Sequence, residues 1–217
     1  MEKLINEYWK KRLEGVKISL EKNNFEAYVV ENRDEARELV MRELLPASKA
    51  KSVSWGGSMT FLATGLYDAL KNTPGLEIVD TYDKTLVGWE AIERRRQSLL
   101  VDLYFTSANA ITEDGMLVNL DGMGNRVAAL AFGPKRVVVL AGRNKVVSEL
   151  DDAMNRIKDY AAPINSMRLE RKTPCAKTGY CEDCNSPERI CNVWAIHEKS
   201  FPKGRIKVVL INEDLGF

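Results

Sequence analysis

The chain has 217 residues, enough for one domain or for one domain with an appendage. Its 32 basic and 31 acidic residues leave a net charge of +1, without the basic surplus of most nucleic-acid-binding domains. With 45% hydrophobic and 29% charged residues, the composition excludes collagen-like, disordered and coiled-coil proteins. No apolar run approaches the ~20 residues that cross a bilayer, and the first residues lack the apolar core of a signal peptide. We therefore expect a cytoplasmic globular protein that binds neither nucleic acid nor a membrane.

Predicted strands and helices alternate through the first 160 or so residues. An apolar stripe from Ile5 to Leu20 predicts a helix over residues 2–22, which could pack against a partner chain in a homodimer. Further helices are predicted at 33–45, 59–70, 84–100 and 148–162, and strands at 25–30, 51–55, 76–80, 102–108, 136–142, 192–197 and 205–211. Residues 111–122 are predicted to form a hairpin that turns at Asp114-Gly115.

Several of these strands are apolar on both faces, as in sheets that are covered by helices on both sides. The pattern predicts an α/β fold with a largely parallel sheet flanked by helices. We find no linker, so residues 1–217 are interpreted as one domain with a cysteine-rich C-terminal insertion at 173–192. The three consecutive arginines at 94–96 are interpreted as a solvent-exposed helix face and not as a phosphate-binding site.

All four cysteines lie close together near the C-terminus, with the spacing C-x5-C-x2-C-x6-C: Cys175, Cys181, Cys184 and Cys191. Disulfides that stabilise a fold usually close longer loops, so four crowded thiols are better interpreted as ligands of one metal centre. A structural zinc site of the ribbon type usually has two C-x2-C pairs, whereas this chain has one. The spacing therefore favours an iron–sulfur cluster over zinc. Free or disulfide-paired thiols are a third alternative.

Ligands of open α/β sheets bind beyond the carboxyl ends of the strands, and three turns at such ends contain polar residues. In the first, Gly56 and Gly57 allow close approach of an anion to the backbone, and Ser58 adds a hydroxyl donor. The alternative is a tight turn with Ser58 as the helix N-cap. In the third turn, after the predicted strand at 136–142, Lys145 could meet an anion or lie in a surface turn.

The second turn region is the polar stretch that follows the strand at 102–108. Its acids could act as general base or nucleophile, its amides could orient a carbonyl or a ribose, and its arginine could clamp a carboxylate or phosphate. Alternatively, the same acids and amides only cap the hairpin and the next helix. The candidate catalytic residues are Glu113 and Asp121, and the candidate substrate-binding residues are Asn109, Asn125 and Arg126.

Five segments together make the chain resemble the LUD-domain family of lactate-utilisation proteins. They are GGSM at 56–59, SANAITEDG at 107–115, VNLDGMGNRVAAL at 118–130, FGPKRVVVLAGRNKVV at 132–147 and TPCAKTGYCEDCNSPERICN at 173–192. The resemblance implies a fold similar to ribose-5-phosphate isomerase A, 5-formyltetrahydrofolate cyclo-ligase and the coenzyme A transferases, with GGSM as a phosphate-binding turn. The turn at Glu113 is loosely similar to the E-N-G turn of the coenzyme A transferases, but Asp114 places a second negative charge beside it.

Three functions fit these observations. The first is a redox-linked protein of 2-hydroxy-acid (lactate-like) metabolism, with an iron–sulfur or other metal centre beside a pocket for a small anionic metabolite. Because no flavin or nicotinamide fingerprint is present, its cluster would exchange electrons with partner redox subunits. The second is a transferase, isomerase or ligase that acts on a phosphorylated or coenzyme-linked substrate and contains a structural metal. The third is a non-catalytic regulator that senses a metabolite or the redox state.

Overall fold

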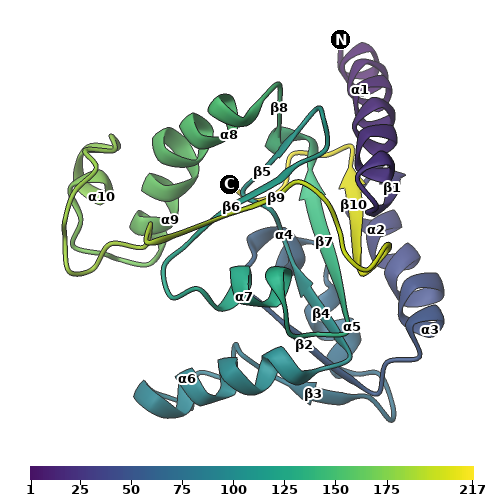
Figure 1. Cartoon of the computed structure of the whole chain (residues 1–217), viewed down its shortest axis with the longest axis horizontal. Helices are drawn as coiled ribbons and strands as arrows, with labels where there is room; N and C mark the ends of the chain where they lie inside the picture. Colours follow the sequence, from purple (N-terminus) through teal and green to yellow (C-terminus); the bar gives the residue numbers. More distant parts are fainter.

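A six-stranded sheet, parallel at every pairing, forms the centre of the computed structural model, which describes residues 1–217 (Figure 1). Its strand order is β1-β10-β7-β4-β2-β3. The strands are β1 (Glu26–Val30), β2 (Ser52–Trp55), β3 (Glu77–Val79), β4 (Leu103–Thr106), β7 (Arg136–Gly142) and β10 (Ile206–Ile211). The predicted α/β class with a parallel sheet is confirmed.

Both faces of this sheet are covered by helices because successive side chains of the central strands point to opposite sides. In β7, Val137 and Val139 enter one hydrophobic core, whereas Val138 and Leu140 enter the other. The first core is closed by α1 (Glu2–Lys22) and α7 (Asn125–Ala131). The second is closed by α2 (Arg33–Leu39), the π-helical turn Val40–Leu44, α3 (Leu45–Ser48), α4 (Met59–Ala63) and α5 (Leu66–Lys71). The predicted helix over 2–22 is confirmed.

A second, four-stranded sheet of order β8-β5-β6-β9 lies beside the first, and the sequence patterns did not predict it. Its strands are β5 (Ala110–Thr112), β6 (Leu117–Asp121), β8 (Val146–Val147) and β9 (Val193–His197). The predicted hairpin is confirmed by the antiparallel pairing of β5 with β6, and β9 extends it by pairing antiparallel with β6. α8 (Leu150–Arg156), the π-helical turn Ile157–Ala161 and α9 (Ala162–Arg168) follow β8. Ala153 and Ile157 pack against this sheet.

Two peripheral segments complete the fold. α6 (Gly88–Gln97) has no buried residue and runs along the edge of the molecule near β3 (Figure 1). It continues into a 3-10 turn, Ser98–Leu100, and a second 3-10 turn, Arg143–Lys145, follows β7. The cysteine segment forms the short helix α10 (Pro174–Thr178) and then an irregular stretch between α9 and β9 (Figure 1). No helix in the structure combines the length and the apolar character needed to cross a membrane.

α1 is held against the β5–β6 hairpin by a close backbone contact at Gly115. The φ angle of Gly115 is +88°, in the region that favours glycine. A Cβ atom at this position would lie 2.7 Å from the backbone N of Leu20 and from the backbone C of Ser19. The side chain of Asn23 adds a hydrogen bond of 2.9 Å to the carbonyl of Asp114. The hairpin and α1 therefore fit together only with glycine at position 115.

Replacement of Gly115 by alanine should destabilise the protein by about 3 kcal/mol, the combined cost of a left-handed alanine and of overpacking against α1. Gly75→Ala is the matched control, because Gly75 also has a positive φ, +74°, but has no atom within 4 Å of the added Cβ. The control should lose only about 1 kcal/mol. Urea unfolding would measure both values, and equal losses would contradict the proposed α1–hairpin fit.

Candidate functional site

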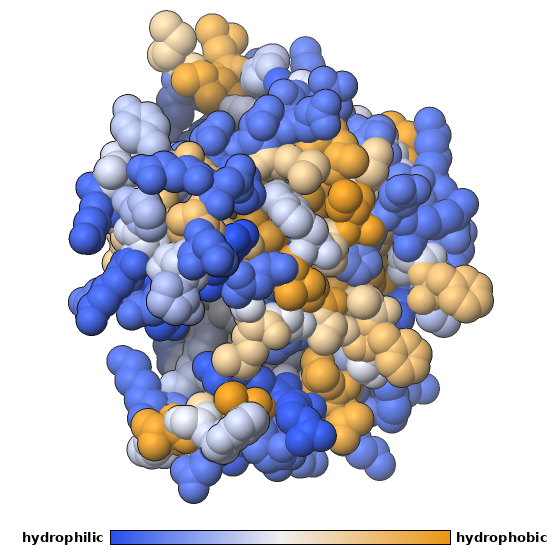
Figure 2. Space-filling model, turned by 60° about the vertical axis from the view of Figure 1, so that its left-hand side comes forward, coloured by the Kyte–Doolittle hydropathy of each residue, from blue (hydrophilic) through white to orange (hydrophobic).

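A cavity of about 620 Å³ opens beyond the carboxyl ends of β2, β4 and β6. Its walls come from the turns after these strands, from α6, from the end of α9 and from residues 187–190 of the cysteine segment. Figure 2 brings this side of the molecule forward and shows a hollow in the surface with hydrophilic residues around it. We refer to this cavity as the cleft.

The structure brings most of the predicted site residues together at the cleft. Gly57, Ser58, Asn109, Asp121, Asn125, Arg126 and Lys145 line it. Gly56 lies behind this surface, where an added Cβ atom would be 2.7 Å from Cγ of Arg126. Glycine at position 56 therefore allows the Arg126 side chain to lie against the end of β2.

Glu113 is the predicted catalytic residue that the structure does not bring to the cleft. It follows β5, and its carboxylate accepts hydrogen bonds from the guanidinium of Arg12 in α1, including one of 2.8 Å from Nε. The hairpin turn faces α1 because Gly115 packs against that helix. The observed role of Glu113 is therefore an ion pair between the hairpin and α1.

In the turn after β2, most polar groups already form hydrogen bonds within the protein. The hydroxyl of Ser58 accepts a hydrogen bond of 3.0 Å from the backbone N–H of Phe61, so Ser58 is the N-cap of α4. The backbone N–H of Ser58 donates to the phenol oxygen of Tyr82 at 3.0 Å, and that phenol donates to the carbonyl of Gly56 at 2.8 Å. Burial raises the pKa of Tyr82 to about 12, so the phenol stays protonated at neutral pH. The space beside Gly57 is the part of the turn that is open to a ligand.

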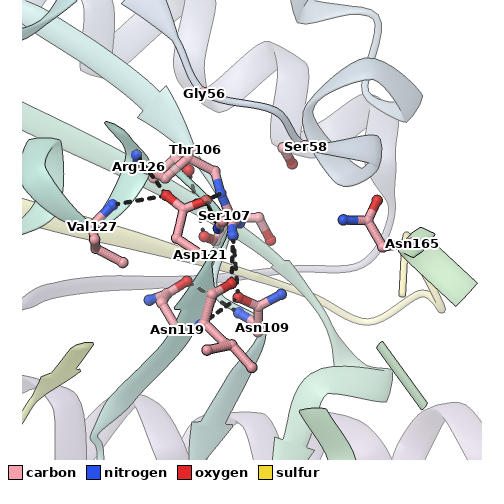
Figure 3. A network of polar contacts seen from close by, with 12 residues as sticks. Gly56, Ser58, Thr106, Ser107, Asn109, Asn119, Asp121, Arg126, Val127 and Asn165 are labelled. Carbon is pink, nitrogen blue, oxygen red and sulfur yellow. Dashed lines mark hydrogen bonds and ion pairs between the residues drawn. The ribbon is translucent and has the colours of Figure 1, made fainter. Parts of the chain in front are cut away.

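Asp121, at the end of β6, anchors the polar network in Figure 3. Its carboxylate accepts hydrogen bonds from the backbone N–H groups of Gly122 and Arg126, both at 2.9 Å, and from that of Val127 at 3.4 Å. The guanidinium of Arg126 lies 3.5 Å from the same carboxylate and donates to the carbonyl of Leu120 at 2.9 Å. The network holds the first turn of α7 and Arg126 in place beside the cleft.

Asn109 extends this network to the neighbouring strand. Its side-chain oxygen accepts a hydrogen bond of 3.0 Å from the backbone N–H of Leu120 and lies 3.5 Å from Nη2 of Arg126. Ser58 and Asn165 lie apart from this network across open space in Figure 3, and both line the cleft. The cleft thus separates a rigid wall of hydrogen-bonded groups from the turn after β2 and from α9.

Lys145 is 4% exposed, and its amine has only hydroxyl partners. Nζ lies 2.9 Å from Oγ1 of Thr60 and 2.8 Å from Oγ of Ser107. Burial, with smaller contributions from the positive charges of Arg156 and Arg126, lowers the pKa of Lys145 to about 7. A large fraction of this amine is therefore neutral at physiological pH, and the surface-turn alternative is wrong for Lys145.

Four further cationic residues line the cleft that the sequence analysis did not assign to it: Arg95, Arg168, Arg171 and Arg189. Together with Arg126 and Lys145 they face only two acidic side chains, Asp121 and Glu188. Arg95 belongs to the arginine run at 94–96, but it lines the cleft, whereas Arg96 pairs with Glu93 on the outer face of α6. The excess of positive charge makes the cleft suited to an anion.

All four cysteines are free and line one small apolar cavity of about 10 Å³, close to the space of a single water. Lys158 and Arg189 line the same cavity, and the Arg189 guanidinium donates to the carbonyls of Cys184 and Cys191, both at 2.7 Å. A hydrogen bond with Asp183 raises the pKa of Lys158, and the charges of the nearby cysteines act in the same direction. The donor set suits a thiophilic metal. However, no group of three or more Cys, His, Asp or Glu side chains is arranged to hold a metal ion.

The thiol cavity and the cleft share a wall. Arg189 and Ile190 line both of them. The segment is held there by a hydrogen bond of 2.9 Å from the backbone N–H of Asn192 to the carbonyl of Asp121. It also packs on Gly122, where an added Cβ atom would lie 3.2 Å from Cα of Ile190. A change in the cysteine segment would therefore alter one side of the cleft.

The LUD domain family matches residues 13–211 of the chain, which is nearly its whole length. The chain belongs to the LUD domain family. A crystal structure of a DUF162 family protein from Deinococcus radiodurans is similar, with a TM-score of 0.50 and 14% sequence identity over 94% of this chain and 97% of the other. At that identity the likeness concerns the fold alone. No curated protein matches the chain.

Lys145→Met should stabilise this LUD-domain protein most strongly at or below pH 7. Between pH 7 and 10.5 the unfolded chain binds a proton at this lysine and the folded chain does not, so the parent gains stability as the pH rises. Its disadvantage relative to Lys145→Met should shrink by at most about 1.4 kcal/mol per pH unit over that range.

Urea unfolding of both proteins at several pH values would measure this difference. Lys207→Met is the control, because Lys207 is also largely buried but pairs with Glu26, so its loss should destabilise the protein. A stability difference between Lys145→Met and the parent that is constant from pH 7 to 10 would show that the buried amine is charged.

Proposed function

We propose that this LUD-domain protein is a redox-linked protein of 2-hydroxy-acid (lactate-like) metabolism. It binds a small anionic metabolite in the cleft, beside a metal centre held by the cysteine segment. The observation that carries the proposal is a cleft in which five arginines face two acidic side chains, with one wall formed by the segment that contains all four thiols.

The anion-binding part of the proposal rests on cations that have no acidic partner. Of the five arginines in the cleft, only Arg126 lies within ion-pair distance of a carboxylate, that of Asp121. Cations in a concave site with low-dielectric walls attract anions more strongly than the same cations on an open surface. Arginine also matches the planar geometry of a carboxylate with two parallel hydrogen bonds. Free carboxylates of 2-hydroxy and 2-oxo acids fit this chemistry.

The metal part of the proposal rests on the chemistry of the donor set. Cys175, Cys181, Cys184 and Cys191 would be the ligands, and Lys158 and Arg189 line the same cavity. An iron–sulfur cluster is favoured over zinc because the cysteine segment has one C-x2-C pair, whereas structural zinc sites of the ribbon type usually have two. When bound, such a cluster would exchange single electrons with partner redox subunits.

A second candidate function is favoured by the size of the cleft. A volume of about 620 Å³ is in the range of pockets for drug-sized ligands and exceeds the needs of a three-carbon acid. Arg95, Arg168 and Arg171 could bind a second anionic group, such as a phosphate. This candidate is a transferase, isomerase or ligase that acts on a phosphorylated or coenzyme-linked substrate, with a structural metal.

Calorimetric titration with L-lactate and pyruvate tests the anion site. Both acids should bind, and binding should weaken as the ionic strength rises, because the attraction is electrostatic. Arg171→Gln and Arg95→Gln should weaken binding roughly tenfold if each arginine makes a charge-assisted hydrogen bond to the ligand. Arg96→Gln should leave it unchanged, because Arg96 belongs to the same helix as Arg95 but pairs with Glu93. Binding of coenzyme A without binding of either acid would favour the second candidate.

Anaerobic purification followed by analysis of iron, sulfide and zinc tests the metal centre. Iron and sulfide should accompany the parent protein, and Cys184→Ser should lose them. Ser186→Ala is the control within the same segment, because its hydroxyl donates to the carbonyl of Lys172 and not to the thiol cavity. Zinc in place of iron and sulfide would end the electron-transfer role, and a metal-free parent protein would end the metal proposal.

A further inference from the structure

The hydrogen bonds around Lys145 suit a neutral amine better than an ammonium ion. The hydroxyl of Thr60 donates its proton to the carbonyl of Leu215 at 3.0 Å, and that of Ser107 donates to the carbonyl of Ala108 at 3.2 Å. Each hydroxyl therefore meets Lys145 as an acceptor. A neutral amine has two N–H groups, which these two oxygens satisfy, whereas an ammonium ion has a third N–H for which the protein supplies no acceptor.

The charges near Lys145 favour the same form. The charged groups that act on it are Arg156 and Arg126, both positive, and no carboxylate pairs with its amine. Other partly buried lysines of this protein differ in this respect: Lys207 pairs with Glu26, and Lys158 pairs with Asp183. Lys145 is thus a buried lysine that is held by hydroxyls and surrounded by positive charge.

The remaining feature of this amine is its lone pair. When both N–H groups bond to Thr60 and Ser107, the lone pair receives no hydrogen bond from the protein. Lys145 and Ser107 both line the cleft, and Nζ of Lys145 lies 2.8 Å from Oγ of Ser107. A neutral, desolvated lysine beside bound substrate is the arrangement by which enzymes activate an amine as a nucleophile.

We propose that Lys145 is a nucleophile that forms an imine with the carbonyl carbon of a 2-oxo acid bound in the cleft. The proposal rests on the anion-binding cleft of the proposed function and names the substrate class of that site. The Nζ lone pair adds to the carbonyl carbon, and one N–H proton moves from the nitrogen to the former carbonyl oxygen. The resulting hydroxyl leaves with the second N–H proton as water, which leaves a C=N bond, and addition of water reverses both steps. The sequence needs no oxidant or reductant, and the cleft arginines would hold the carboxylate.

Reductive trapping tests this proposal directly. The parent protein is treated with pyruvate and cyanoborohydride at pH 7, and the modified residues are located by peptide mass spectrometry. Lys145 should be modified at least about tenfold faster than any exposed lysine, because an ordinary lysine is almost wholly protonated at this pH. Lys207 serves as the internal control and should stay unmodified.

Two further measurements test whether the reaction takes place at Lys145 and inside the cleft. Lys145→Met, which is expected to fold, should lose the fast adduct, whereas Arg96→Gln, which lies outside the cleft, should keep it. L-lactate should also slow trapping in the parent, because it has a carboxylate for the cleft but no carbonyl carbon for the amine. Fast trapping that lactate does not slow would place the reaction outside the cleft and overturn the proposal.

The failure of imine formation can be distinguished from the failure of the proposed function. If pyruvate binds in calorimetry but Lys145 reacts no faster than exposed lysines, the nucleophile proposal is wrong and the anion site stands. If pyruvate neither binds nor is trapped, both are wrong.

Discussion

The contact between Gly56 and Arg126 joins the two sheets, and the cleft depends on it. Gly56 directly follows β2 of the main sheet, whereas Arg126 lies in the first turn of α7, the helix that follows β6 of the second sheet. Any side chain at position 56 would meet the Arg126 stem at 2.7 Å, so the arginine would have to leave its place. The carbonyl of Leu120 and the carboxylate of Asp121 hold its guanidinium from the other side. Arg126 is therefore a fixed positive charge, oriented before any ligand arrives.

Such fixed charges matter because the cleft is otherwise built from groups that already have partners. The turn after β2 uses the hydroxyl and N–H of Ser58 internally, and the Asp121 carboxylate accepts three backbone N–H groups. The cleft residues without an acidic partner are four arginines and the buried amine of Lys145. A preorganised positive site loses little free energy to reorganisation when an anion binds, so this arrangement supports the proposed anion site.

Local patterns predicted the main sheet well because parallel strands that are buried on both faces are continuously apolar, and the amphipathic helices between them have a clear period. They could not predict the second sheet. β9 pairs with β6 across more than seventy residues, from Leu117 with His197 to Asp121 with Val193, and this pairing leaves no local signal. The same limit applies to the site: Arg168, Arg171 and Arg189 reach the cleft only because α9 and the cysteine segment fold back over the end of β6.

Glu113 and Lys145 illustrate what a residue's position at the end of a strand does and does not determine. Both follow strands, and both were predicted to reach the same site. Glu113 lies in a hairpin turn, whose direction is set by the glycine contact with α1, so its carboxylate meets Arg12 instead of a ligand. Lys145 follows a central strand of the parallel sheet, where the chain turns over the carboxyl edge, and there it lines the cleft. The amine of Lys145 contacts the hydroxyls of Thr60 and Ser107, which follow other strands, and no acidic side chain. These contacts are far apart in the sequence, so only the folded chain reveals them.

The shared wall between the thiol cavity and the cleft gives the cysteine segment a physical means of acting on a bound anion. The Arg189 guanidinium donates to the carbonyls of Cys184 and Cys191, so the positions of these cysteines set the position of a charge that lines the cleft. Metal binding or oxidation of the thiols would move those carbonyls before it moved any residue of the main sheet, because the segment is irregular and the sheet is not. The electrostatic field at the cleft would then depend on the state of the thiols even where no electron passes between them and the ligand.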